Sequence, residues 1–124
     1  MLGGSDLIAF VAATDMARTK TFYGDIMGLA LKADDGFALV FDCNGTMLRV
    51  SKVQKATVAP YTVLGWSVRD IRGKIQELGK KGVVFERFQG FPQDDLGAWT
   101  APDGTKVAWF KDPEGNLLSL TEFH

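Results

Sequence analysis

Residues 107–120 read VAWFKDPEGNLLSL, and this stretch decides the fold. Two apolar runs flank the turn-forming segment DPEGN, which predicts a β-hairpin. Pro113 presets its own φ for a turn, and Gly115 can adopt a positive φ. The side chains of Asp112 and Asn116 can bond to nearby backbone groups. We therefore interpret these turn residues as structural rather than catalytic.

The hairpin has a counterpart in the first half of the chain. A shift of 70 residues places Asp42 on Asp112, and a shift of 55 residues places Asp15 on Asp70. The two shifts differ because the second half carries an insertion, Phe88–Thr105. Both shifts preserve the order of strands, helix caps and turns, which indicates an internal duplication.

Each half shows the same order of predicted elements, β-α-β-β-β. An apolar run comes first, followed by an Asp-capped amphipathic stripe and then by short strands separated by turn residues. Helices are expected at 16–27 and 71–78, and strands at 7–13, 30–33, 37–41, 46–51, 62–68, 83–87, 106–111 and 117–122.

These elements predict an α+β protein with a single domain over residues 1–124. Module 1 covers about 6–52, a weakly patterned linker covers 53–60, and module 2 covers about 61–124. One βαβββ module cannot bury its sheet and helix faces alone, so two must pair. We expect two tandem βαβββ modules that form a curled mixed sheet with the helices on its outer face.

Composition favours a small-molecule partner. The 124 residues are 46% hydrophobic, and 14 basic residues against 15 acidic ones give a formal charge of −1. We expect no nucleic acid partner and no membrane partner, because there is no large basic field and no apolar run near the ~20 residues that span a bilayer. The start has no signal-type core and Cys43 is the only cysteine, so we expect a cytoplasmic location.

Two segments resemble those of a known family. Residues 7–23 join an apolar strand to a helix capped by Asp15 that carries the aromatic pair Phe22-Tyr23, and 107–120 contain the DPEGN hairpin. Both resemble the vicinal oxygen chelate superfamily of glyoxalases, bleomycin resistance proteins and extradiol dioxygenases. The resemblance covers about residues 7–123. It implies that small molecules bind on the concave sheet face and that the protein forms a homodimer.

The resemblance also implies four positions for metal ligands, on the first and last strands of each module. In this chain they fall on Ile8, Arg49, Val63 and Ser119. Isoleucine and valine have no donor atoms, arginine repels a cation and serine is a poor ligand. The only histidine is His124, the last residue. We expect a metal-ligand-deficient member with no metal and no cofactor, and neither metal-dependent glyoxalase nor dioxygenase activity.

The concave face is the expected ligand site. Period-two alternation places Phe10 on the face of Ile8, and Arg49 is the one cation there, able to clamp a carboxylate or phosphate. The aromatic residues in and after the insertion could form a stacking wall over a flat ligand, or could fill the core or a dimer contact. The candidate ligand-binding residues are Ile8, Phe10, Arg49, Val63, Phe91, Trp99, Trp109 and Ser119.

Three functions stay open. The first is binding of a small organic molecule in a metal-free concave pocket. The second is a metal-independent enzyme of lyase or isomerase type, whose anionic substrate is held by Arg49. The third is a non-catalytic interaction domain. No residue is assigned as catalytic: Cys43 has no nearby base, and the acids Asp94 and Asp95 are expected to be solvated in a mobile loop over 93–97.

Overall fold

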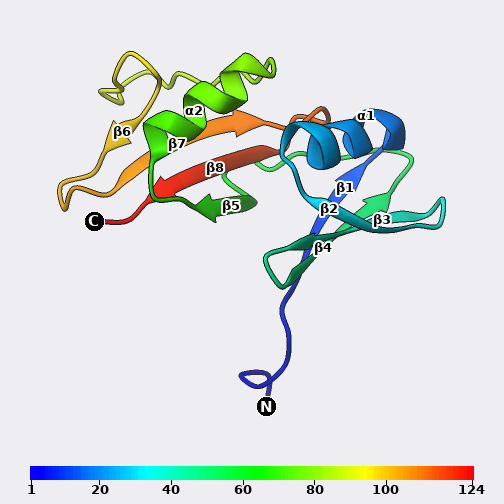
Figure 1. Cartoon of the computed structure of the whole chain (residues 1–124). Coiled ribbons are helices and arrows are strands. Elements are labelled where there is room, and N and C mark those ends of the chain that lie inside the picture. The colour runs from blue at the N-terminus through cyan, green and yellow to red at the C-terminus, as the bar shows by residue number, and fades with distance from the viewer. The chain divides into compact units, whose positions relative to one another are not determined.

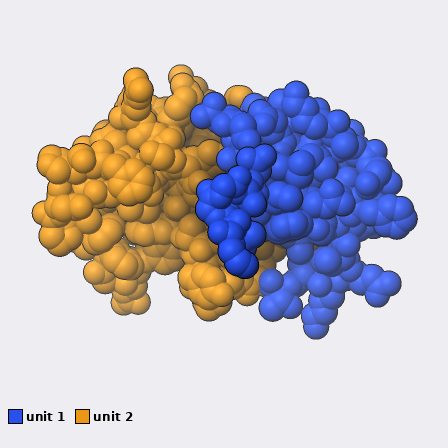
Figure 2. Space-filling model, turned by 90° about the horizontal axis from the view of Figure 1, so that it is seen from below, with its two compact units in different colours: residues 1–57 blue, residues 58–124 orange.

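The computed structural model describes residues 1–124, and the chain divides into two compact units, Met1–Thr57 and Val58–His124. Figure 1 traces the elements and Figure 2 shows unit 1 in blue and unit 2 in orange. Each unit contains one four-stranded mixed sheet. The predicted α+β class with two βαβββ-like modules is confirmed, and the strands form two sheets.

Unit 1 begins with a strand and a helical segment and continues with three strands. Its sheet has the order β1-β4-β3-β2, in which β1 runs parallel to β4 and the other neighbours are antiparallel. The elements are β1 (Ile8–Ala13), α1 (Met16–Lys20), the π-helix η1 (Thr21–Ile26), β2 (Ala30–Asp34), β3 (Ala38–Cys43) and β4 (Thr46–Lys52).

The first helical segment differs from the single helix expected at 16–27. Asp15 caps it as predicted, since its Oδ1 accepts a hydrogen bond from the N–H of Arg18 at 3.1 Å. From Thr21 onward the chain forms the wider π-helix. There the consecutive residues Phe22 and Tyr23 are both buried, and the Tyr23 ring contacts that of Phe41 at 6.0 Å.

The two faces of the unit 1 sheet differ in burial. The face that carries Phe41 meets the helical segment through Tyr23. The opposite face carries Phe10, which is 60% exposed, and the strand register places Arg49 directly beside it. The buried residues of the helix-side face are Val11, Ala13, Leu39, Phe41, Leu48 and Val50.

Unit 2 has the sheet order β5-β8-β7-β6, with β5 parallel to β8 and the other pairs antiparallel. Asp70 caps its helix by accepting a hydrogen bond from the N–H of Gly73 at 3.1 Å. The helix packs on β7 and β8 (Figure 1). The elements are β5 (Leu64–Ser67), α2 (Ile71–Lys80), β6 (Trp99–Thr100), β7 (Lys106–Lys111) and β8 (Leu117–Glu122).

The strand expected at 83–87 is wrong. Phe85 makes only an isolated bridge with Phe110, and the N–H of Glu86 donates to the carbonyl of Trp109 at 2.8 Å. The fourth strand of this sheet is β6, which comes from the insertion and pairs with the start of β7. The insertion therefore supplies a sheet strand and leaves the segment before it with one bridge.

The turn between β7 and β8 is closed by Asp112. Its Oδ1 accepts hydrogen bonds from the N–H groups of Glu114 at 3.0 Å and Asn116 at 2.9 Å, and its Oδ2 accepts from Asn116 Nδ2 at 2.8 Å. Gly115 has a φ of 91° and donates to the carbonyl of Asp112 at 3.0 Å. This network fixes the register in which Trp109 faces Ser119.

None of the helices combines the length and the apolar character that a membrane crossing requires.

Candidate ligand-binding site

Four aromatic rings gather in unit 2, and we call Phe88, Phe91, Trp99 and Trp109 the aromatic wall. The ring centroids of Phe88 and Trp109 are 5.3 Å apart in an edge-to-face arrangement. Phe91 lies 5.5 Å from Trp99 and 5.8 Å from Trp109, and the two tryptophan rings are 6.3 Å apart. Each separation is in the range of attractive ring pairs.

The sheet and the insertion together position this wall. Trp99 pairs with Val107, two residues before Trp109, so both tryptophan side chains stand on the same face of the sheet. A tight turn, in which the N–H of Phe91 donates to the carbonyl of Phe88 at 3.2 Å, brings the Phe91 ring to them. Phe91 is 46% exposed and the other three rings are half-buried, so the wall has a solvent-facing side.

The sheet face that carries the two tryptophans also carries a serine, a glycine and a valine. Trp109 pairs with Ser119, which pairs with Gly65, so all three lie on one face. A Cβ atom on Gly65 would lie 2.7 Å from the Ser119 Oγ, so the absence of a side chain there makes room for the hydroxyl. Val63, 40% exposed, lies two residues before Gly65 and faces the same way.

Five of the eight candidate residues thus lie in unit 2, on or against one sheet face. Three of them, Phe91, Trp99 and Trp109, are in mutual ring contact. Phe88 was not among the eight candidates, although its place at the start of the insertion was a signal. Gly65 was not among the eight candidates either, although alternation from Val63 places it on the same face.

Gln93 holds the base of the insertion with its amide. Its Oε1 accepts from the N–H of Phe88 at 2.8 Å, and its Nε2 donates to the carbonyls of Glu86 at 2.9 Å and Gly97 at 2.8 Å. A single side chain therefore takes the place of strand pairing between the segment before the insertion and the segment that leads to Trp99.

The two acids lie in a loop and are solvent-exposed, as expected, with side chains that are 37% and 74% exposed, but they also bind arginine side chains that the sequence did not indicate. Arg72 Nη1 donates to Asp94 Oδ2 at 2.7 Å and to Asp95 Oδ1 at 3.0 Å. Arg87 donates to the backbone carbonyls of the same two acids at 2.6 and 2.8 Å. Asp94 Oδ1 also accepts from the N–H groups of Leu96 and Ala98, both at 2.9 Å.

These contacts shift the titration of the loop acids. Partial burial by itself would raise the pKa of Asp94, but the N–H groups of Ala98 and Leu96 and the Arg72 guanidinium outweigh it and lower the pKa. The hydrogen bond from Arg72 lowers the pKa of Asp95. Both acids are therefore held in the charged form that binds Arg72.

Unit 1 carries the other three candidates on one sheet face. Phe10 pairs with Arg49, and Ile8 pairs with Met47. Ile8 is 44% exposed, and Arg49, a half-buried residue, has no salt bridge within the chain. The charge of Arg49 also reaches Asp35, whose pKa is lowered mainly by the backbone N–H groups of Phe37 and Ala38.

The four positions that the resemblance assigns to metal ligands do not fit a divalent metal. Ile8 and Val63 offer only carbon atoms, Arg49 offers a positive charge, and Ser119 offers one neutral hydroxyl. No three His, Cys, Asp or Glu side chains of the chain come close enough to hold a metal ion. A metal-free site stays a prediction.

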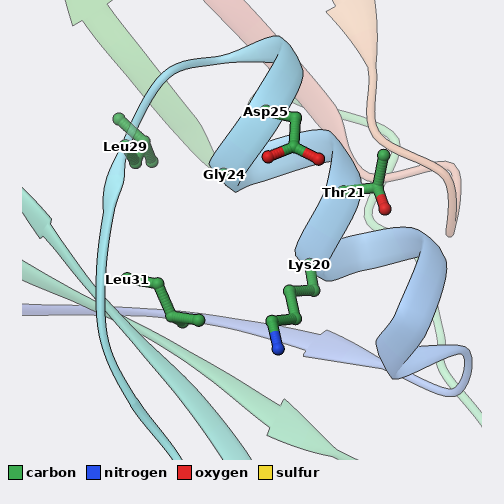
Figure 3. Close-up of a pocket in the computed structure, with 6 residues that line it drawn as sticks. All are labelled: Lys20, Thr21, Gly24, Asp25, Leu29 and Leu31. Atoms are coloured by element: carbon green, nitrogen blue, oxygen red, sulfur yellow. The ribbon is translucent and has the colours of Figure 1, made fainter.

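Sequence reasoning missed a hollow of about 360 Å³ in unit 1. It lies between the helical segment and the start of β2 and is lined by none of the eight candidates (Figure 3). The amino group of Lys20 forms a salt bridge with Asp34 at 3.3 Å, and Asp25 also has a partner. Two charged groups that line this hollow therefore already have partners within the chain.

Cys43 is a weak candidate for a nucleophile. Partial burial, reinforced by the charge of Asp42, raises the pKa of its thiol. The reactive thiolate is therefore disfavoured at neutral pH.

One family model covers most of the chain. The family model described as Glyoxalase/Bleomycin resistance protein/Dioxygenase superfamily matches residues 6–120. No curated protein matches the chain.

Several solved structures share the fold. A glyoxalase family protein from Bacillus anthracis has a TM-score of 0.77 at 21% identity, covering 100% of this chain and 98% of that one. An antibiotic binding protein from a Streptomyces species has a TM-score of 0.74 at 21% identity, covering 100% and 99%. A lactoylglutathione lyase from Agrobacterium tumefaciens has a TM-score of 0.73 at 16% identity, covering 96% and 93%.

Proposed function

Because the chain belongs to the Glyoxalase/Bleomycin resistance protein/Dioxygenase superfamily, we propose that it binds a planar aromatic small molecule against the aromatic wall, without a metal ion. The observation that carries this proposal is the cluster of four rings, all within 5.3 to 6.3 Å of a neighbour, on a face with one solvent-facing edge. Such clusters offer a flat ligand both stacked and edge contacts.

The rest of this face suits such a ligand. Ser119, which is 7% exposed, carries a hydroxyl that can exchange a hydrogen bond with a polar substituent, and the missing side chain at Gly65 accommodates that hydroxyl. Val63 adds an exposed apolar contact. The likeness to an antibiotic binding protein supports the proposal at the level of the fold alone.

A second candidate function follows from Arg49. A half-buried arginine without a salt bridge, beside the exposed Phe10, suits a carboxylate or phosphate on an aromatic or aliphatic body. This is the metal-independent enzyme, with Arg49 orienting an anionic substrate. If Arg49→Ala and Arg49→Lys both leave ligand affinity and any turnover unchanged, this candidate is excluded.

The experiment for the main proposal is a thermal-shift and fluorescence titration with a panel of planar aromatic compounds, both neutral and anionic. We expect a saturable shift, and we expect Phe91→Ala and Trp109→Leu each to weaken the affinity about fivefold, since one aromatic contact contributes about 1 kcal/mol beyond area burial. Trp66→Phe is the matched control, because Trp66 stacks on Phe110 at 6.5 Å and stands on the helix side of the sheet.

Two results would overturn the proposal. One is the absence of a saturable shift across the panel. The other is a shift that the Phe91 and Trp109 variants leave intact. If the panel gives no shift and the exposed aromatic and aliphatic side chains become protected in a protein complex, the third function, a non-catalytic interaction domain, takes its place.

A further inference from the structure

We propose that Arg72, a residue on α2 outside the aromatic wall, is a positioning residue that latches the inserted loop and so sets the wall for its ligand. This inference rests on the proposed function for the identity of the site. It goes beyond it by assigning a role to a salt-bridge network that does not touch the ligand.

The loop joins two rings of the wall directly. Phe91 lies two residues before Gln93, and Trp99 directly follows Ala98. Between them the chain closes on itself: Gln93 bridges to Trp99, and the N–H of Asp94 donates to the carbonyl of Ala98 at 2.8 Å. A movement of the loop tip therefore moves the backbone that carries both rings.

Arg72 ties the loop tip to the helix. Its guanidinium contacts Asp94 at 2.7 Å and straddles the Asp95 carboxylate, with Nη1 at 3.0 Å and Nη2 at 3.4 Å. The planar fork makes these bonds directional, which an ammonium group cannot reproduce. The other end of Arg72 is fixed, because the adjacent Ile71 is buried in the core.

A second anchor supports the first. Arg87, which directly precedes Phe88, donates hydrogen bonds to the backbone carbonyls of Asp94 and Asp95 at 2.6 and 2.8 Å. Arg72 and Arg87 thus hold the same two loop residues, one through side chains and one through backbone. Through these hydrogen bonds, α2 and the start of the insertion are both connected to the loop that joins Phe91 to Trp99.

The salt bridges of Arg72 are solvent-exposed, so Arg72 can position the loop without contributing much to the stability of the whole protein. The side chains of Arg72, Asp94 and Asp95 are 44%, 37% and 74% exposed. Exposed salt bridges contribute little to global stability. Loss of Arg72 should therefore loosen the loop and its rings while the two sheets stay folded.

The test compares Arg72→Ala and Arg72→Lys with Lys74→Ala, in a Trp66→Phe background in which Trp99 and Trp109 are the only tryptophans. Lys74 is the matched control, since it lies on the same helix and pairs only with Glu77, at 3.3 Å. The ligand-free readouts are acrylamide quenching of tryptophan emission and amide hydrogen exchange at Leu96 and Ala98. The binding probe is 8-anilinonaphthalene-1-sulfonate.

We expect Arg72→Ala to increase quenching, to speed amide exchange in the loop and to weaken probe binding about fivefold, the scale of one lost surface ion-pair network. Arg72→Lys should fall between it and the parent, and Lys74→Ala should match the parent. Melting temperatures should stay close throughout.

Unchanged quenching and exchange in Arg72→Ala would overturn the latch, as would a loosened loop with unchanged probe affinity. A lysine variant equal to alanine in every readout would overturn the role of the charge. Failure of the proposed function gives a different pattern: Trp109→Leu would leave probe binding unchanged, while the ligand-free readouts would still decide whether Arg72 holds the loop.

Discussion

At the scale of single residues, Asp112 shows how one carboxylate can determine a hairpin. It is 6% exposed and accepts three hydrogen bonds within its own turn. We expect Asp112→Ala to lower the free energy of unfolding by about 2–3 kcal/mol, because it leaves buried donors without acceptors. Asp112→Asn keeps one acceptor oxygen and should cost about 1 kcal/mol. Urea denaturation measures both; equal losses in the two variants would contradict this account.

The loop acids predict a pH dependence of stability. Arg72 and local N–H groups depress the folded-state pKa of Asp94 and Asp95. Their contribution to stability is therefore complete above the unfolded value of about 3.9 and is lost as the pH falls through the lower folded value. Because the network is solvent-exposed, the Tm difference between the parent and the Asp94→Asn/Asp95→Asn double variant should be small, constant from pH 7 to about pH 5, and shrink toward pH 3. A difference that grows on acidification would refute the assignment, and Asp6→Asn in the N-terminal segment is the control.

At the scale of elements, Gln93 takes the place of a strand. Gln93→Ala removes three hydrogen bonds to the backbone of Phe88, Glu86 and Gly97. We expect a loss of about 2–3 kcal/mol in unfolding free energy, together with faster exchange of the Phe88 amide. Gln93→Glu keeps the acceptor for Phe88 and loses both donors, so it should preserve the protection of that amide better than alanine. Equal exchange in the two variants would count against the proposed role of the Oε1 atom.

Most elements follow from the sequence because their signals are local. Asp15 and Asp70 cap their helices as expected, and apolar alternation located seven of the eight strands approximately. The failure at 83–87 has a cause that is not local. The segment is apolar enough for a strand. However, the carbonyl of Glu86 accepts a hydrogen bond from the Gln93 side chain, and β6 pairs with β7 in its place. The π-helix at Thr21–Ile26 carries no signal in the spacing of apolar residues, which is close to that of an α-helix.

The candidate site was predictable in part for the same reason. Trp109 was a candidate as an aromatic residue and Ser119 as a position that the family resemblance implies, and the strand register places both on one face. The insertion drew attention to Phe91 and Trp99. Arg72 and Gln93 were missed. The guanidinium of Arg72 reaches acids more than twenty residues away, and nothing in the helical pattern distinguishes it from a solvated arginine. Contacts that depend on where an insertion folds back cannot be inferred from periodicity.

At the scale of the whole molecule, the exposed apolar face of unit 1 predicts self-association. Ile8, Phe10 and Met47 are 44%, 60% and 40% exposed, and β1 is an edge strand of its sheet. We expect light scattering to give twice the chain mass of 13.6 kDa. Phe10→Asp should shift the protein toward the monomer, whereas Phe37→Asp, at an exposed position in the β2–β3 turn, should not. A parent protein that stays monomeric at high concentration would contradict the predicted homodimer.

Whether the protein binds a divalent metal decides between Lewis-acid chemistry and metal-free binding of an organic ligand. The prediction of a metal-free site rests on the donor set of Ile8, Arg49, Val63 and Ser119, which offers no ligand group beyond one hydroxyl. A metal that bound the folded protein at 100 times its Kd would stabilise it by about 2.7 kcal/mol, a shift that thermal unfolding detects easily. We expect no saturable shift with Zn²⁺, Ni²⁺, Mn²⁺ or Fe²⁺, and no stoichiometric metal by elemental analysis.

A positive control makes that result interpretable. The variant Ile8→His/Arg49→Glu places two good ligands on neighbouring strands of the same face and should gain a measurable shift with Zn²⁺. A shift in the variant and none in the parent would assign the metal-free character to these side chains. A shift in the parent would overturn the ligand assignment, and Lewis-acid chemistry would then have to be considered alongside organic ligands of the aromatic wall.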